Sequence, residues 1–321
     1  MPLQRLRIVS IVGILISLAA WELFLILVNY PRNSVPPFPP SASFAPHATR
    51  GWQHREGSHT LVRVESPLSS PFNVTYLPDG RRRSSEHDRA DNPPLILLGC
   101  SFTEGFGLSD RDTFAWMLQE KLATYHVENW GVSGYGTIHS LLLLRSLANR
   151  APLHQPGVVV YGFAPFHATR NVKNPLVQRT WEEPLTFPIC DEVACSSWSG
   201  RKMGSLLESS RLISLIENAW DSAYQATIHA AAARVTERLI LDMAREAASQ
   251  GMRFVVAPVT ELPPAWQAFF KSHNLEVVTC AGTEIAGPEY HQPDGHPNEK
   301  WSAHFSSCLA EHLTAQAPAL P

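Results

Sequence analysis

Five apolar runs of strand length recur along the C-terminal two thirds of the chain, and segments with helical periodicity separate them. The runs span residues 95–100, 126–130, 157–163, 252–259 and 275–280. Between them apolar residues share one helix face, as Phe114 and Leu118 do after Asp112, the predicted helix cap; similar patterns cover 141–147 and 239–248. Strands that are apolar on both faces are typical of a parallel sheet covered by helices. The pattern predicts an α/β fold with three αβα layers around a mainly parallel, five-stranded sheet.

The residues that follow the first strand are the first candidates for chemistry, because ligands bind beyond the carboxyl ends of strands in such sheets. The first run leads directly into the segment 99–105, GCSFTEG. A serine on a strand-to-loop turn presents its hydroxyl at the top of the sheet, and flanking glycines allow the tight bend. Ser101 is therefore the candidate nucleophile, and its plainer interpretation is a turn residue. Cys100 is the alternative nucleophile, but it completes the apolar strand, so we expect its thiol to point into the core.

Two further blocks carry groups that a serine nucleophile requires. The second run ends in NWGVSGYGT (129–137), whose glycines expose backbone N–H groups of the kind that stabilise an oxyanion. Near the C-terminus, Asp294 and His296 lie on a loop before an amphipathic helix. A histidine held by a carboxylate is the usual base for a serine hydroxyl. The plainer interpretation of His296 is a surface histidine or a helix cap, and His291 and His304 are the other candidate bases.

Taken in order, the blocks GCSFTEG, NWGVSGYGT and DGHPN resemble those of the SGNH/GDSL hydrolase superfamily. They also resemble a membrane-anchored bacterial branch with a GCSFT nucleophile block. The resemblance runs from Pro94 to the C-terminus and implies an SGNH-like, flavodoxin-like fold. It implies that Ser101 is the nucleophile, that His296 is the base and that Asp294 orients it. It also implies that the oxyanion donors are the backbone N–H groups of Ser101 and Gly134.

The third strand departs from the family pattern, and so does the Asp-to-His offset, which is one residue shorter than in the commonest form. The segment 161–171, YGFAPFHATRN, lacks an asparagine at the place where family members offer one to the oxyanion. Either His167 or Arg170 supplies the missing donor, or the backbone donors act alone. Glu104 is a further auxiliary candidate, with an ordinary loop residue as the alternative.

The N-terminal run from Ile8 to Val28 has 21 residues and a single charge, Glu22. At about 1.5 Å per residue this length matches the roughly 30 Å core of a bilayer. Arg5 and Arg7 precede the run and only Arg32 follows it closely, so the positive-inside rule places the N-terminus in the cytoplasm. We predict a single-pass anchor in a bacterial inner membrane, with the following domain periplasmic or extracellular. A cleaved signal peptide and a buried core helix are the alternatives.

Composition shifts divide the chain into segments. We expect a cytoplasmic tail at 1–7, an anchor at 8–28, a proline-rich linker at 29–50, a small β subdomain at 51–91 and a hydrolase-like domain at 92–321 with an insertion at 171–221. The insertion lacks a clear period, as is typical of a lid or binding element. Its Trp181 and Trp198 either form a sugar-stacking platform or pack against the sheet. A predicted turn at 78–80 precedes the arginines 81–83, which we expect in a solvated loop, with contact to an anionic substrate as the alternative.

Four cysteines are candidates for disulfide bonds. Cys190 and Cys195 are close enough in sequence to close a small loop, and Cys280 and Cys308 form the second candidate pair. Outside the cytoplasm such bonds persist. Zinc is a poorer interpretation, because no second Cys or His pair at ligand spacing accompanies the first two cysteines.

Charged residues make up 17% of the chain and the formal net charge is -3, so the sequence carries no electrostatic footprint for nucleic acid. We predict a serine-dependent esterase that acts on O-acyl esters of a cell-envelope glycan or similar polysaccharide, without a metal or organic cofactor. The same triad performs acyl transfer, so an O-acyltransferase on an exopolysaccharide is one alternative. The other is a non-catalytic carbohydrate-binding protein on the same fold, which the missing asparagine favours.

Overall fold

A parallel five-stranded sheet with the order β13-β12-β7-β5-β6 lies at the centre of the protein. The computed structural model describes residues 2–32, 43–62, 71–87, 89–148, 157–174, 179–180, 185–199, 201–202 and 210–315. The central strands are β5 (Pro94–Leu98), β6 (His126–Asn129), β7 (Val158–Phe163), β12 (Arg253–Pro258) and β13 (Glu276–Val277). Four of them lie within predicted runs and β5 begins one residue before its run, at Pro94, so the predicted α/β fold is confirmed.

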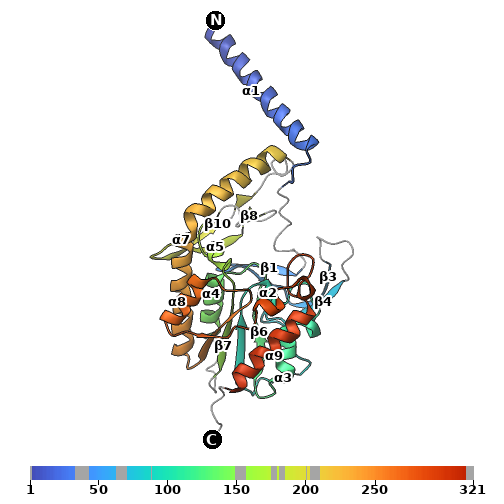
Figure 1. The fold of residues 1–321 in the computed structure, drawn as a ribbon, viewed down its shortest axis with the longest axis vertical. Coiled ribbons are helices and arrows are strands. Elements are labelled where there is room, and N and C mark those ends of the chain that lie inside the picture. The colour runs from blue at the N-terminus through green and yellow to red at the C-terminus, as the bar shows by residue number, and fades with distance from the viewer. Residues whose placement is uncertain are drawn as a thin grey trace.

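Helices cover both faces of this sheet (Figure 1). They are α3 (Phe114–Lys121), α4 (Thr137–Ala148), α7 (Arg211–Ser249), α8 (Pro264–Ser272) and α9 (Glu299–Ala315). Ile96 and Leu98 of β5 belong to the core cluster that contains α4, α7 and α8. Leu95 and Leu97 belong to the cluster that contains α3 and α9. Because successive strand side chains point to opposite faces, one short strand serves both layers. The three-layer arrangement is thereby confirmed.

The strand order reverses at β5, because the chain passes from β5 to β6 on one side and then returns to β7 on the other. In doubly wound sheets the crevice outside the carboxyl ends of the strands at such a reversal is the usual ligand site. The short helix α2 (Ser101–Glu104) follows β5 at this edge, and α5 (His167–Asn171) follows β7. The fold therefore places both segments where a site is expected.

Two helix starts differ from the sequence-based prediction. The cap of α3 is Thr113, whose hydroxyl accepts a hydrogen bond from Trp116 N at 3.3 Å, and the predicted cap Asp112 is wrong by one residue. Asp112 ends the 3-10 turn η1 (Asp110–Asp112), whereas the extended backbone of Thr113 lets its side chain reach the first turn. Helix α7 begins at Arg211, inside the segment 171–221 in which we found no period.

Short strands pair outside the central sheet. They are β1 (Phe44–His47), β2 (Gly51–His54), β3 (Gly57–Leu61), β4 (Phe72–Tyr76), β8 (Arg179–Thr180), β9 (Thr186–Cys190), β10 (Cys195–Ser199) and β11 (Arg201–Lys202). Strand β1 lies in the predicted linker 29–50, of which 33–42 fall outside the described residues, as does Trp181. Leu77 O accepts from Gly80 N at 2.8 Å, which confirms the turn at 78–80. After it, Arg82 bridges β4 to the edge strand β6.

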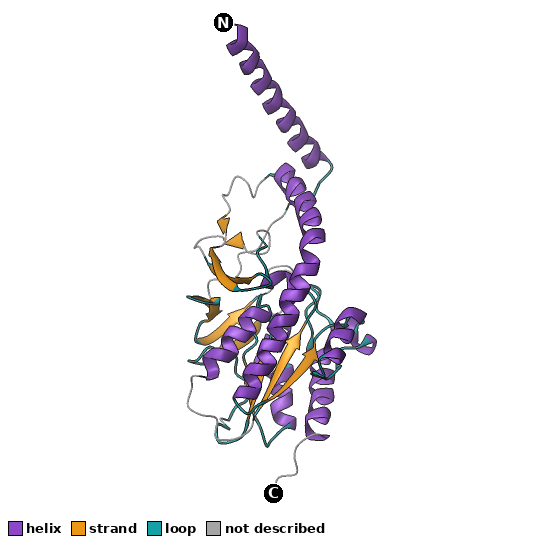
Figure 2. Cartoon of the chain, turned by 90° about the vertical axis from the view of Figure 1, so that its left-hand side faces the viewer, coloured by secondary structure: helices purple, strands orange, loops and turns teal. Residues whose placement is uncertain are grey.

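Helix α1 (Pro2–Leu27) stands apart from the body of the protein, as Figure 2 shows. Its segment Val9–Leu27 is, among the described residues, the one helical stretch long and apolar enough to cross a membrane, and almost none of it is buried in the protein.

The cysteines of both candidate pairs are bonded: Cys190 to Cys195 across the β9–β10 hairpin, and Cys280 to Cys308 of α9. Cys100 is a free, buried thiol, as predicted.

Candidate active site

Ser101 is the first residue of α2, directly beyond the carboxyl end of β5. The bend between strand and helix depends on Gly99, whose φ of 156° and close approach to Thr103 leave no room for a Cβ atom. The serine is 8% exposed, whereas Cys100 before it is fully buried. The chain thus turns the serine, and not the thiol, toward the edge of the sheet.

His296 lies against this serine. Its Nε2 atom is 2.9 Å from Ser101 Oγ, within hydrogen-bond distance, although the two residues are 195 positions apart. Asp294 accepts a hydrogen bond from His296 N at 3.0 Å through Oδ1, and its Oδ2 lies 3.1 Å from His296 Nδ1. The second contact is close but poorly aligned as a hydrogen bond. Such contacts tighten when a substrate is bound, so this geometry is compatible with a carboxylate that orients the imidazole.

Gln292 fixes the loop that carries His296. Its Nε2 donates to Phe106 O at 2.9 Å, just beyond α2, and to Pro297 O at 2.5 Å. Gln292 N also donates to His296 O at 2.7 Å. One buried amide therefore ties the histidine loop to the serine loop. Sequence reasoning missed this residue, because a lone glutamine two positions before an aspartate carries no signal of its own.

Asn298 fixes the other end of the same loop. Its Oδ1 accepts from Lys300 N and Trp301 N at 2.9 and 3.2 Å, as a cap of α9 does.

The other candidate bases, His291 and His304, have partners away from Ser101. His291 Nδ1 bonds Gly287 O, and His304 Nε2 lies 3.6 Å from a carboxylate oxygen of Glu284.

Gly134 lies on the loop that follows β6 and has a φ of 81°, a left-handed conformation that favours glycine. The N–H groups of Gly134 and Ser101 have no acceptor among the residues that the structure describes. The preceding residue, Ser133, donates to Glu104 Oε2 from its backbone N and from its hydroxyl, at 2.6 and 2.5 Å. Since Glu104 belongs to α2, its carboxylate holds the loop of Gly134 against the helix of Ser101.

Glu104 is buried, and its carboxylate has partners from three other segments: β2, β4 and the Gly134 loop. Its Oε1 accepts from the Tyr76 hydroxyl at 2.6 Å and lies 3.2 Å from His54 Nε2. Burial raises the pKa of Glu104, but its interaction with His54 and the hydrogen bonds of Ser133 and Tyr76 outweigh burial and lower the pKa to about 2. The carboxylate is therefore ionised at neutral pH. The structure places it in the supporting network of the site and not beside Ser101 Oγ.

Arg82 holds the segment that follows Ser101, residues 104–110, through its buried guanidinium. The side chain is fully buried and donates to Glu104 O, Gly105 O and Leu108 O, at 3.0, 2.8 and 2.6 Å, and to Asp110 Oδ1 at 3.0 Å. The prediction that arginines 81–83 occupy a solvated loop is wrong for Arg82, because five donors in a planar fork match the carbonyl groups that turn inward after α2. Three consecutive arginines resemble a surface run, so the sequence alone conceals this residue.

The two auxiliary candidates on α5 lie differently. His167 is fully buried and pairs with the Tyr161 hydroxyl at 2.9 Å; burial and then Arg170 hold its pKa well below the usual range. Arg170 donates to Tyr135 O at 2.9 Å, next to Gly134, and its guanidinium lies over the ring of Phe166. Arg170 therefore hydrogen-bonds to the segment of the oxyanion candidate through its side chain, whereas the His167 side chain pairs with β7.

Aromatic rings border the imidazole. The centroids of Phe102 and Phe106 lie 5.6 and 5.0 Å from that of His296, and Phe166 lies 6.0 Å from Phe102. Phe166 is 37% exposed, so an apolar surface leads from solvent to the serine. This surface suits an acyl chain or the apolar face of a sugar.

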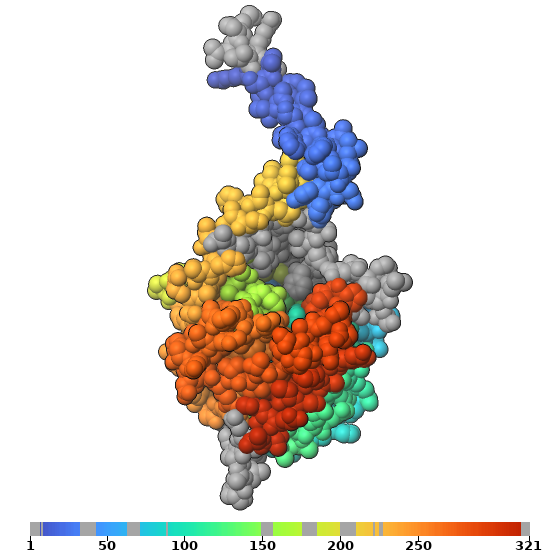
Figure 3. Space-filling view, viewed as in Figure 1, coloured from blue at the N-terminus to red at the C-terminus, as the bar shows by residue number. Residues whose placement is uncertain are grey.

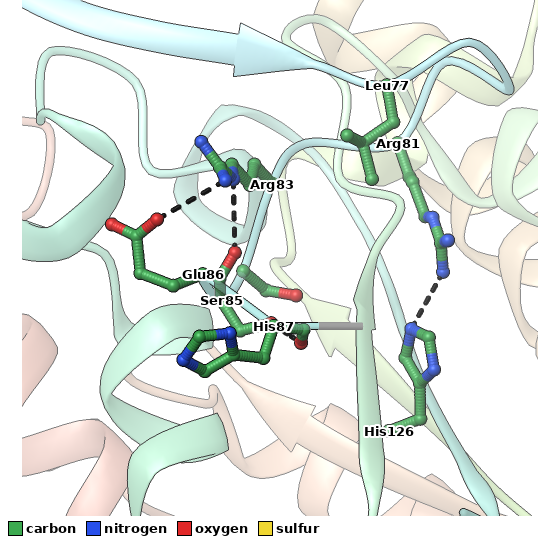
Figure 4. Close-up of a pocket in the computed structure, with 8 residues that line it drawn as sticks. Leu77, Arg81, Arg83, Ser85, Glu86, His87 and His126 are labelled. Carbon is green, nitrogen blue, oxygen red and sulfur yellow. Dashed lines mark hydrogen bonds and ion pairs between the residues drawn. The ribbon is translucent and has the colours of Figure 1, made fainter. Parts of the chain in front are cut away.

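A separate cavity of about 220 Å³ opens beside His126, at the amino end of β6 (Figure 4). Its charges are largely compensated: Arg83 pairs with Glu86, and Arg81 contacts His126, Glu128 and Asp79. None of Ser101, Asp294 and His296 lines it. Among the described residues, no three His, Cys, Asp or Glu side chains are grouped closely enough to hold a metal ion.

No family model and no curated protein matches the chain. Three of the solved structures to which it is similar are TesA, a lipolytic protein of the G-D-S-L family from Veillonella parvula, and the psychrotrophic esterase EstA from Pseudoalteromonas sp., inhibited by monoethylphosphonate. Their sequence identities to this chain are 16%, 12% and 12%, and their TM-scores are 0.44, 0.43 and 0.43. The similarity covers 69%, 69% and 70% of this chain and 98% of each of the other chains. At these values the similarity carries no argument about the activity of this chain, which has to come from its own residues.

Proposed function

We propose that the chain is a serine hydrolase that cleaves acyl esters, with Ser101 as nucleophile, His296 as general base and acid, and Asp294 as the group that orients the imidazole. The observation that carries the proposal is the 2.9 Å contact between Ser101 Oγ and His296 Nε2 at the strand-order reversal, with a carboxylate on the far side of the ring. A serine hydroxyl is a weak nucleophile unless a base takes its proton, and this arrangement supplies the base.

The reaction proceeds in two halves. Ser101 Oγ attacks the ester carbonyl carbon while its proton passes to His296 Nε2, and the carbonyl oxygen becomes an oxyanion. The tetrahedral intermediate collapses, the C–O bond to the alcohol breaks, and His296 returns the proton to the leaving oxygen. Water then attacks the acyl-serine with His296 as base, which releases the carboxylic acid and restores Ser101.

Backbone donors at Ser101 and Gly134 stabilise the oxyanion in this proposal. A donor of this kind contributes about 3–4 kcal/mol to transition-state stabilisation in well-studied enzymes. The carboxylate of Glu104 supports it by fixing Ser133 N, one residue before Gly134. The pre-formed serine–histidine contact favours catalysis over the non-catalytic binding alternative, which gives no reason for the two groups to meet.

We further propose that α1 anchors the protein in a bacterial inner membrane, with the N-terminus in the cytoplasm and the domain outside. The length of the apolar helix and the arginines before it support this placement. On that location we propose an O-acyl ester of a cell-envelope glycan as substrate. Acyl transfer to a sugar hydroxyl uses the same acyl-serine. An assay of acetyl loss from a glycan and of acetyl gain by a glycan therefore distinguishes hydrolysis from transfer.

Labelling with a fluorophosphonate probe tests the nucleophile. We expect the full chain in detergent to react and Ser101→Ala to lose the label. Its esterase kcat should fall about 10⁴-fold or more, to the residual level that binding and oxyanion donors provide. Ser249→Ala, at the exposed end of α7, is the matched control and should label like the wild type. Equal labelling of Ser101→Ala and the wild type would refute the assignment.

A further inference from the structure

The single charge of the apolar N-terminal run, Glu22, is paired with the start of α7. Its carboxylate accepts from Ser210 Oγ and from the backbone N of Arg211 and of Leu212, at 2.8, 2.8 and 2.9 Å. The first N–H groups of a helix have no partner within the helix, and an acidic group there is favourable. The carboxylate thus caps α7 from another helix.

Further contacts hold the two helices together. Arg211 donates to Asn29 Oδ1 at 3.2 Å and to Tyr30 O, and Asn218 donates to the Tyr30 hydroxyl at 3.1 Å. Ser214 is buried on the same side of α7. Residues 211, 214 and 218 repeat at three and four positions, so one face of α7 packs on the end of α1.

The contact at Glu22 sets the depth of α7. Glu22 lies six residues before Val28, where the apolar run ends. At 1.5 Å per residue this separation is about 9 Å. If α1 spans a bilayer, the first turn of α7 lies roughly that far inside its apolar boundary.

The free face of α7 at this depth is apolar. Ile216 is 58% and Trp220 is 62% exposed, and Leu212 is partly exposed four residues before Ile216. These residues repeat every four positions and form one stripe. Such a stripe with a tryptophan at its outer end fits the boundary between lipid chains and headgroups.

We propose that residues 211–220 of α7 form a second membrane-contacting element, seated in the outer leaflet beside α1, and that α7 holds the active site over the bilayer. The occupant of the apolar stripe is lipid, because the stripe begins at a depth that the anchor itself defines. The proposal rests on the proposed anchoring and adds the orientation of the site to the proposed function.

The length of α7 sets the distance between the membrane and the edge of the sheet that carries Ser101. Its first core residue is Ala232, and Thr236 bonds Asn171 at the carboxyl edge of the sheet. From Trp220, at the outer end of the stripe, to Thr236 are 16 positions, or about 24 Å along the helix. Because α7 runs antiparallel to the next strand, β12, its start projects beyond the edge that carries Ser101, as Figures 1 and 2 show. In Figure 3, α1 and the first turns of α7 lie at one end of the molecule. The Ser101 edge therefore faces the membrane, and a membrane-attached acylated molecule with an extended headgroup is the substrate that this orientation serves.

Site-specific fluorescence in lipid nanodiscs tests the proposal. Ile216→Cys, Val193→Cys and Leu15→Cys are made in the full chain and labelled with an environment-sensitive dye in nanodiscs of phosphatidylethanolamine and phosphatidylglycerol. The wild type gives the background, because four of its cysteines are bonded and Cys100 is buried. We expect nitroxide-labelled lipids to quench the dye at 216, and aqueous iodide to quench it roughly five-fold less than at 193. Val193 is 89% exposed in the β9–β10 turn and serves as the matched apolar control.

Three outcomes contradict the proposal, and they differ in what else they remove. If iodide quenches the dye at 216 as strongly as at 193 but not the dye at 15, residues 211–220 do not contact the membrane, and α1 remains the anchor. If iodide also quenches the dye at position 15, both the anchoring by α1 and the membrane contact of residues 211–220 are refuted. Protection at 216 without quenching by nitroxide lipids shows that protein, such as a second copy of the chain, covers the stripe. Fluorophosphonate labelling of Ser101 in the same nanodiscs reports on the hydrolase proposal independently.

Discussion

Glu104 is the residue at which the serine helix, the Gly134 loop, β2 and β4 meet. Replacing it with Gln keeps the shape but removes the charge that His54 and Tyr76 surround. We expect Glu104→Gln to lower the free energy of unfolding by about 3–5 kcal/mol, the usual cost of breaking a buried pair. We also expect a lower kcat with little change in KM, because the Gly134 donor loses its support in the transition state. Urea unfolding and ester kinetics measure the two effects. Glu120→Gln, on the exposed side of α3, should change neither.

His139 makes stability depend on pH. Burial, then the charges of Arg170 and Arg50, lower its pKa to about 3, from 6.5 in the unfolded chain. Between these values the unfolded state binds more protons, so stability is fully present above pH 6.5 and is lost as pH falls toward 3. In His139→Asn we expect the slope of unfolding free energy between pH 6 and 5 to fall by about 1 kcal/mol per pH unit. His229→Asn, an exposed histidine of α7, should leave the slope unchanged. Because buried His167 contributes a slope of its own, the outcome that contradicts the assignment is a slope in His139→Asn equal to that of the wild type.

At the scale of elements, the loop from 291 to 298 depends on one amide to reach the serine. Gln292→Leu removes the donors to Phe106 O and Pro297 O while it fills similar space. We expect kcat to fall about 10–100-fold, because a displacement of roughly 1 Å costs this much in a positioned pair. Gln267→Leu on α8, which removes a comparable side-chain hydrogen bond to Leu262 O, is the control. Equal kinetics of the two variants would show that Gln292 does not position His296.

The two disulfides close loops of different length, and this difference predicts different contributions to stability. Cys280–Cys308 spans 28 positions and Cys190–Cys195 spans 5. Loop-closure entropy gives roughly 3.6 and 2 kcal/mol for the two bonds. We expect the double alanine variant at 280 and 308 to lose more unfolding free energy in urea than the one at 190 and 195. The reverse order would mean that the α9 bond adds little beyond the packing that already holds this helix.

At the scale of the whole molecule, the direction of α1 decides which compartment the active site meets. If the N-terminus is cytoplasmic, Val193→Cys reacts with a membrane-impermeant maleimide in intact spheroplasts of a bacterial host. Gln4→Cys then reacts only after lysis. Labelling at position 4 in intact cells, without labelling at 193, would reverse the proposed topology.

Local pattern was sufficient for several elements. The runs at 95–100 and 157–163 predict strands because a chain buried on both faces must be apolar throughout. The turn at 78–80 follows from Pro, Asp and Gly, whose backbone preferences are local. The start of α7 was not predictable, because its first turns pack on α1, and that contact joins residues almost 190 positions apart.

The sequence by itself determined which segments form the central sheet, the apolar N-terminal helix and the candidates Ser101, Asp294 and His296, because strand burial, helix length and glycine-flanked turns leave local marks. Only the tertiary structure decided that Ser101 and His296 meet, that Arg82 is a core residue and that Glu22 caps α7. Each of these depends on a long-range contact, and a charge or an amide in the sequence shows neither its burial nor its partner. Where the chain folds back, the partner determines whether an arginine is solvated or holds a loop in place.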